Sequence, residues 1–177
     1  MTGRFIGLDV GAETVKVVEL AGAPGRLTWT RRARVDHQKD PAAALLGLLE
    51  AWGLPDAAGA AATGRLGRVL ALDRVPGKQA RIAGHRFLHG EGQAAGVVDI
   101  GAHGFSVLLL EPDGRDVYRE NPRCSQGTGN FLRQLVERFG LGPEEADALA
   151  RGAEAAPLSG RCPVILKTDM THLANKG

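Results

Sequence analysis

The sequence lacks any apolar run long enough to cross a membrane, and only 5% of its 177 residues are aromatic. A spanning helix needs about 20 consecutive apolar residues. The N-terminus also lacks the apolar stretch and the cleavage site of a signal peptide. These absences exclude an integral membrane protein of ordinary type and predict a cytoplasmic protein without a membrane span.

Long runs of like charge are also missing, and the formal net charge is only +2. The basic cluster at residues 31–34 (Arg-Arg-Ala-Arg) is short, and no aromatic residues interleave it. It therefore fits a solvated strand end better than a nucleic-acid-binding patch. The chain has only 2 cysteines. That number is too small for a tetrahedral metal centre within one chain, and a cytoplasmic protein seldom forms disulfides.

One structural pattern occurs twice along the chain. Three strand-like segments are followed by a helix-like segment, with the first strand of each copy beginning near Ile6 or Val97. The expected strands span residues 5–10, 15–20, 26–35 and 58–63, then 96–99, 105–110 and 115–120; the expected helices span 41–52, 79–88 and 128–139, with a further helix from 143. This repeat predicts an α/β fold with two similar lobes, residues 1–95 and 96–177.

Each copy has a glycine-containing turn directly after its first strand. Residues 9–12 read Asp-Val-Gly-Ala and residues 99–102 read Asp-Ile-Gly-Ala. Glycine allows a backbone to approach a polyphosphate, and a carboxylate at a strand end can hold Mg²⁺ or orient an attacking water. One such turn also fits a plain hairpin, but two matching turns favour phosphate binding, and the P-loop and Rossmann motifs are absent.

These turns supply the candidate site residues. Asp9 and Asp99 are the candidate catalytic residues. The candidate nucleotide-binding residues are Gly11, Ala12, Glu13, Thr14, Lys16, Gly101, Ala102 and His103. Lys16 lies on the returning strand, where its charge could reach the phosphates. His103 also fits an exposed turn residue, and the other four histidines are expected on the surface or on a helix face.

A cysteine motif lies just before the helix expected at 128–139. Residues 124–132 read Cys-Ser-Gln-Gly-Thr-Gly-Asn-Phe-Leu, so Cys124 precedes a glycine-rich helix start, whose positive end favours an anionic ligand set. The second cysteine is Cys162. Two cysteines from each of two subunits would supply four thiolates to one metal centre. Two unrelated buried thiols are the alternative.

These motifs resemble a known family, the ATPase activators of 2-hydroxyacyl-CoA dehydratases and the related ATPase subunits of benzoyl-CoA reductases. Residues 9–16 match the family's Asp-Ile-Gly-Ser-Thr-Thr-Thr-Lys without a gap. Residues 124–132 match Cys-Ala-Ala-Gly-Thr-Gly-Arg-Phe-Leu, which is the most specific element. Thr63-Gly64 resembles the family's Thr-Gly loop, and residues 162–177 lie in the register of its second cysteine segment.

The resemblance implies an actin-like (ribonuclease-H-like) ATPase fold in which Asp9 and Asp99 face one cleft that holds ATP and Mg²⁺. It implies a homodimer with one 4Fe–4S cluster held by Cys124 and Cys162 of both subunits. It also implies reduced ferredoxin or flavodoxin as electron donor and a dehydratase or reductase as acceptor. The family continues beyond the position of Gly177 with an adenosine-binding loop, so the second lobe is expected to be incomplete.

Departures from the family pattern leave other functions open. Glu13 replaces a hydroxyl residue in the first loop, and residues 102–106 (Ala-His-Gly-Phe-Ser) lack the polar pair and the lysine of the second. Lys167 stands where the family has glutamate. A degenerate activator that hydrolyses ATP poorly is one alternative. A non-catalytic actin-like assembly protein is another, because residues 7–20 also resemble such proteins, but the cysteine motif favours the activator.

Overall fold

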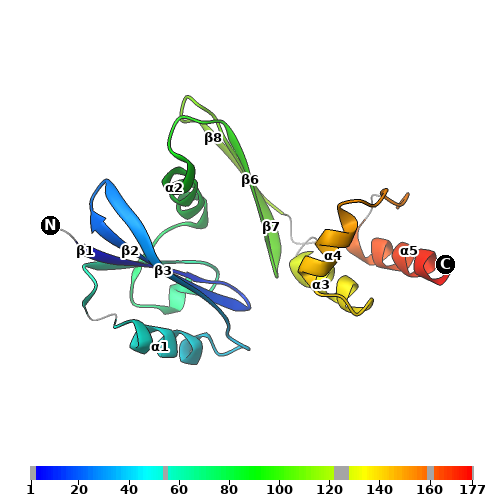
Figure 1. Ribbon diagram of the computed structural model, residues 1–177, viewed down its shortest axis with the longest axis horizontal. Helices are drawn as coiled ribbons and strands as arrows, with labels where there is room; N and C mark the ends of the chain where they lie inside the picture. Colours follow the sequence, from blue (N-terminus) through cyan, green and yellow to red (C-terminus); the bar gives the residue numbers. More distant parts are fainter. Residues whose placement is uncertain (1–2, 54–55, 122–127, 159–161, 177) are drawn as a thin grey trace. The chain divides into compact units, whose positions relative to one another are not determined.

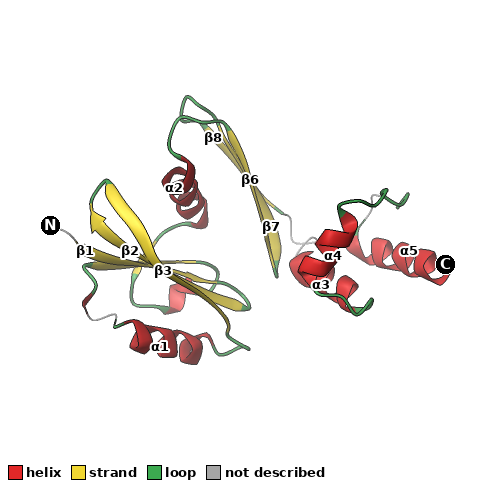
Figure 2. Cartoon of the chain, viewed as in Figure 1, coloured by secondary structure: helices red, strands yellow, loops and turns green. Residues whose placement is uncertain are grey.

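The computed structural model describes residues 3–53, 56–121, 128–158 and 162–176, which form two compact units (Figure 1, Figure 2). Unit 1 comprises Met1–Gln93 and unit 2 comprises Ala94–Gly177. Because the boundary falls between the α2 helix and the β6 strand, each unit contains one of the two aspartate turns.

Unit 1 is built on a five-stranded sheet with the strand order β3-β2-β1-β4-β5. Its elements are β1 (Gly3–Val10), β2 (Thr14–Ala23), β3 (Arg26–Asp36), α1 (Pro41–Trp52), β4 (Gly59–Thr63), the short 3-10 helix η2 (Gly67–Val69), β5 (Asp73–Arg74) and α2 (Gly77–His89). The first three strands are antiparallel, whereas β4 runs parallel to β1. The mixed sheet therefore places β1, with Asp9 near its end, between β2 and β4.

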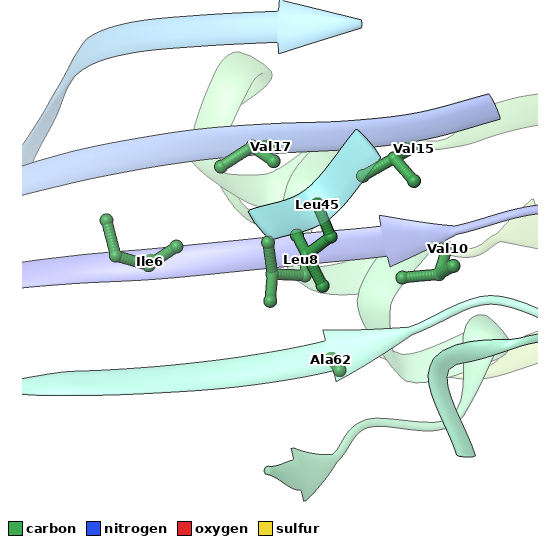
Figure 3. Packing of buried hydrophobic residues seen from close by; sticks show 7 residues of the cluster. All are labelled: Ile6, Leu8, Val10, Val15, Val17, Leu45 and Ala62. Carbon is green, nitrogen blue, oxygen red and sulfur yellow. The ribbon is translucent and has the colours of Figure 1, made fainter. Parts of the chain in front are cut away.

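The core of unit 1 lies between one face of the sheet and α1 (Figure 3). Alternate residues of β1 point into it, since side chains of a strand alternate between the two faces of a sheet. The fully buried members are Ile6, Leu8, Val10, Val15, Val17, Leu45 and Ala62. Asp9 lies between Leu8 and Val10 in β1, so its side chain belongs to the opposite face, away from this core.

A buried carboxylate joins the strands of unit 1 to the end of α1. Glu19 accepts hydrogen bonds from Arg31 Nη2 at 2.6 Å and from Thr30 Oγ1 at 2.6 Å. Arg31 Nη2 also donates to the Trp52 carbonyl at 3.1 Å, and its guanidinium stacks over the Trp52 ring. The hydrogen bond from Arg31 is the main reason that the pKa of Glu19 lies below its ordinary value.

The start and end of α1 follow from local sequence. Asp40 accepts a hydrogen bond from Ala43 N–H at 3.0 Å, Pro41 opens the helix, and Gly53 ends it with φ of 61°. These boundaries were predicted. The surface or helix-face position predicted for the histidines was wrong for His37, which is 4% exposed. Its backbone N–H donates to the Glu13 carbonyl, and its ring Nδ1 accepts a hydrogen bond from the Lys39 N–H at 3.1 Å.

Unit 2 has a three-stranded antiparallel sheet of β6 (Ala95–Gly101), β7 (Gly104–Leu110) and β8 (Asp116–Glu120). It continues with three helices, α3 (Thr128–Glu137), α4 (Pro143–Ala150) and α5 (Pro163–Lys176). Within the described part of this unit, no strand pairs with the outer edge of β6, the position that β4 takes beside β1 in unit 1. The α5 helix was not predicted.

None of the helices in the described ranges is both long enough and apolar enough to cross a membrane.

Candidate nucleotide-binding site

The first aspartate turn joins β1 to β2. Asp9 lies opposite Lys16 in the strand register, and Lys16 Nζ contacts Asp9 Oδ2 at 2.8 Å. The Gly11 N–H donates to the Thr14 carbonyl at 2.9 Å, which closes the turn around Ala12 and Glu13. The Gly11 N–H is thus already hydrogen-bonded within the turn. The predicted phosphate contacts of this loop would therefore come from the residues that follow Gly11.

A second segment of unit 1 packs onto this turn. Gly64 follows β4 with φ of +88°, and a β-carbon there would collide with Asp9 Oδ1 and with the Val10 carbonyl. The Leu66 N–H also donates to the Val10 carbonyl at 2.9 Å. Glycine is required at position 64 because both the left-handed backbone and the close approach exclude a side chain. Thr63-Gly64 is family-like in sequence, but the sequence did not place it in the site.

The second aspartate turn joins β6 to β7, with Ala102 and His103 between the paired residues Gly101 and Gly104. Asp99 lies opposite Ser106, as Asp9 lies opposite Lys16 in the first turn. Ser106 is only 3% exposed and carries no charge. The second turn therefore has a buried hydroxyl at the register position that Lys16 holds in the first turn.

The start of α3 packs against this second turn. A β-carbon at Gly129 would collide with the Gly101 carbonyl oxygen, so the two backbones meet in direct contact. The Asn130 N–H donates to the Ala102 carbonyl at 3.3 Å, and Asn130 Nδ2 lies 3.5 Å from His103 Nε2. Gly129 and Asn130 of the cysteine motif are thereby joined to the second aspartate turn.

The two candidate metal ligands differ in what the structure shows. Cys124 lies outside the described residues. Cys162 is exposed, and its carbonyl accepts hydrogen bonds from the N–H groups of Ile165 at 3.0 Å and Leu166 at 3.1 Å. It thus precedes the first turn of α5. In the described ranges, no three His, Cys, Asp or Glu side chains gather where they could hold a metal ion.

The predicted site residues fall into two groups. Asp9 and Lys16 are in contact, and the turn residues Gly11, Ala12, Glu13 and Thr14 lie between them in unit 1. Asp99, Gly101, Ala102 and His103 form the corresponding turn in unit 2. A cleft shared by the two aspartates stays a prediction, since the turns belong to separate units.

The fold is that of the actin-like ATPases. The chain superposes on the activator of the 2-hydroxyisocaproyl-CoA dehydratase from Clostridium difficile with bound ADPNP, with a TM-score of 0.77 at 22% identity. The match covers 98% of this chain and 67% of the activator. A Ppx/GppA family member from Aquifex aeolicus matches 85% of this chain and 60% of its own, with a TM-score of 0.50 at 16% identity. The predicted actin-like fold is confirmed.

Similarity in sequence points to a particular relative. One of the subunits of the benzoyl-CoA reductase from Thauera aromatica is 30% identical over 183 aligned positions, which cover 97% of this chain and 64% of the relative. No protein-family model matches the chain. The resemblance to the dehydratase activators and benzoyl-CoA reductase ATPase subunits, predicted from the loops and the cysteine motif, is confirmed. The chain spans less than two thirds of that curated relative.

Proposed function

We propose that this chain is part of an ATP-dependent activator that passes low-potential electrons to an enzyme of the 2-hydroxyacyl-CoA dehydratase or benzoyl-CoA reductase type. The observation that carries the proposal is the first aspartate turn, in which Asp9 contacts Lys16 at 2.8 Å while Gly64 packs against the same carboxylate. This turn brings together a carboxylate, a cation and a backbone that glycine leaves open to close approach. Such a site suits a metal–polyphosphate ligand. Similarity to both relatives over nearly the whole chain supports it.

In this proposal both aspartate turns contribute to binding ATP, with Mg²⁺ on its phosphates. The residues fit that group, because Asp9 lies near the end of β1 and Asp99 near the end of β6, and both offer hard oxygen ligands. Bound Mg²⁺ would neutralise charge on the phosphate oxygens. Lys16 would leave Asp9 for a phosphate, while Glu13 would repel the phosphates and weaken binding. The ATPase activity is therefore proposed to be slow.

Cys124 and Cys162 of two copies would together hold one 4Fe–4S cluster. Cys162 fits a cluster ligand, because it is exposed and precedes the first turn of α5, where the partial positive charge of a helix favours an anion. When bound, the cluster supplies a site that takes up and releases a single electron at low potential. Reduced ferredoxin or flavodoxin would be the donor, and the homodimer would act in the cytoplasm.

The contact between α3 and the second turn supports a link between nucleotide and cluster. Gly129 and Asn130 touch the backbone of the turn that begins with Gly101, and Cys124 lies a few residues earlier in the same motif. A shift of the turn on phosphate binding or release would reach the cysteine segment through this contact.

One observation favours the alternative of a non-catalytic actin-like assembly protein. Ser106 of the second turn takes the register position that Lys16 holds in the first turn, and its buried, uncharged hydroxyl offers no positive charge to a phosphate. A protein that only binds nucleotide tolerates such a loss better than one that must stabilise a transition state, since charge stabilisation dominates phosphoryl transfer.

The test is a comparison of Mg-ADPNP binding by calorimetry and ATP hydrolysis for the unaltered chain, Asp9→Asn and a control. Asp113→Asn is the control, because Asp113 lies in the exposed turn between β7 and β8 and pairs with Arg115. Binding and slow hydrolysis should be retained in the control and lost in Asp9→Asn. Binding that is equal in all three proteins would overturn the nucleotide site, and binding without hydrolysis would favour the assembly protein.

A further inference from the structure

A row of polar side chains crosses unit 1 at the first aspartate turn. Asp9 is the register partner of Lys16 on one side and of Thr63 on the other. Register partners on neighbouring strands project from the same face of a sheet. Thr63, from a strand some fifty residues later in the chain, therefore stands beside Asp9 on the face opposite the core.

The hydroxyl of Thr63 is buried and has no hydrogen-bond partner in the part of the chain that the structure describes. A buried hydroxyl without a partner destabilises a fold, whereas valine has nearly the same shape and carries no such penalty. A polar group in this state calls for an explanation beyond packing, and a role in binding a ligand is one of them.

The surroundings of this hydroxyl are already arranged around the Asp9 carboxylate. Oδ2 of Asp9 is taken by Lys16 Nζ at 2.8 Å, whereas Oδ1 lies against Gly64, the residue that follows Thr63. The left-handed backbone of Gly64 turns the chain sharply at this point, and Leu66 anchors the next residues to the Val10 carbonyl. The segment that carries Thr63 is thus fixed against the turn at two positions.

We propose that Thr63 is a positioning residue for the divalent cation of the nucleotide, and that its hydroxyl holds a cation-bound water beside Asp9. The inference rests on the proposed function and deepens it, because it assigns a third strand to the same site. Mg²⁺ keeps several of its waters when protein carboxylates bind it, so a neighbouring hydroxyl that both donates and accepts can orient one of them. Binding would then give the buried hydroxyl the partner that it lacks.

If Thr63 positions the cation, loss of its hydroxyl should change the stability of the fold and the affinity for the cation in opposite directions. In Thr63→Val the strand keeps its shape and loses only the hydroxyl, so the thermal unfolding midpoint without ligand should be equal or higher. The affinity for Mn²⁺ in the presence of ADPNP should nevertheless fall about tenfold, a change of about 1.4 kcal/mol. Thr63→Ser keeps the hydroxyl and should bind Mn²⁺ within about twofold of the unaltered chain.

Mn²⁺ is the probe, and its binding is measured from the electron paramagnetic resonance signal of the free ion with and without ADPNP. The proteins compared are the unaltered chain, Thr63→Val, Thr63→Ser and Asp9→Asn. Thr28→Val is the matched control, because Thr28 lies on β3 opposite Ala21, near the end of β2 that is remote from the first aspartate turn. This control should bind Mn²⁺ as the unaltered chain does.

Three outcomes separate the two hypotheses. Loss of binding in Asp9→Asn together with a tenfold weakening only in Thr63→Val supports the inference. Loss in Asp9→Asn with unchanged binding in Thr63→Val overturns the inference and leaves the proposed function standing. Absence of nucleotide-dependent Mn²⁺ binding in the unaltered chain overturns the proposed function and the inference with it.

Discussion

Gly129, near the start of α3, packs directly on the carbonyl group of Gly101 at the end of β6. No side chain fits between the two backbones, and Asn130 adds a hydrogen bond to the neighbouring Ala102 carbonyl at 3.3 Å. Glycine is thus required at position 129 in unit 2, because it allows α3 to contact the second aspartate turn.

Replacing Gly129 with alanine should therefore separate α3 from the turn. The added methyl group must displace backbone, and overpacking of this kind costs about 1–3 kcal/mol of unfolding free energy. Urea unfolding measures the loss. Gly152→Ala is the control, since a β-carbon at Gly152 would meet nothing within 4 Å and should leave stability within about 0.5 kcal/mol. Equal stability of the two variants would contradict the contact.

Glu13 should weaken nucleotide binding in the unaltered chain. It lies in the turn between Asp9 and Lys16, where its carboxylate adds negative charge beside the phosphates of a bound nucleotide. Glu13→Ser should tighten Mg-ATP binding about tenfold by calorimetry, whereas Glu91→Ser, at an exposed position of the same unit, should leave it unchanged. Tight binding by the unaltered chain would show that Glu13 does not oppose the phosphates.

The Glu19 cluster should make the stability of unit 1 depend on acid pH. The pKa of Glu19 is lowered from the ordinary 4.5, chiefly by the hydrogen bond from Arg31. The unfolded chain therefore takes up the proton at a higher pH than the folded chain does. The stabilisation is complete above about pH 4.5 and is lost as the pH falls through the folded-state pKa.

Thermal unfolding between about pH 3 and pH 7 measures this effect. Glu19→Gln should lower the free energy of unfolding by about 2 kcal/mol at pH 7, because Arg31 keeps only part of its hydrogen bonding. The unfolding midpoint of this variant should also fall less steeply in acid than that of the unaltered chain. Glu154→Gln, at an exposed position, should follow the curve of the unaltered chain. Parallel pH curves for Glu19→Gln and the unaltered chain would refute the role given to the cluster.

Local sequence patterns were sufficient to predict most elements of both units. A short apolar run identified the strand β1, and Asp40-Pro41 with Gly53 bounded α1, because these signals act over a few residues. The α5 helix was missed, since its apolar residues are mixed with polar ones and follow no clear helical period. The two-residue strand β5 is too short to leave a periodic signal.

The same limit applies to the site. The aspartate turns were recognisable because Asp, Gly and the flanking strands are consecutive in sequence. The position of Thr63 beside Asp9 depends on the parallel pairing of β1 with β4, which no local pattern specifies. Likewise, the contact of Gly129 with Gly101 brings together two glycines that only the folded unit places side by side.

In the proposed activator, two copies of this chain share one cluster through their cysteines. The measurement is anaerobic reconstitution with iron and sulfide, followed by the native mass, the iron content and the visible absorption of the unaltered chain and of Cys124→Ser. About four irons per two chains and a dimer are predicted for the unaltered chain, and loss of both for the variant. Unchanged iron content and dimer fraction in Cys124→Ser would contradict the claim and favour the actin-like assembly protein.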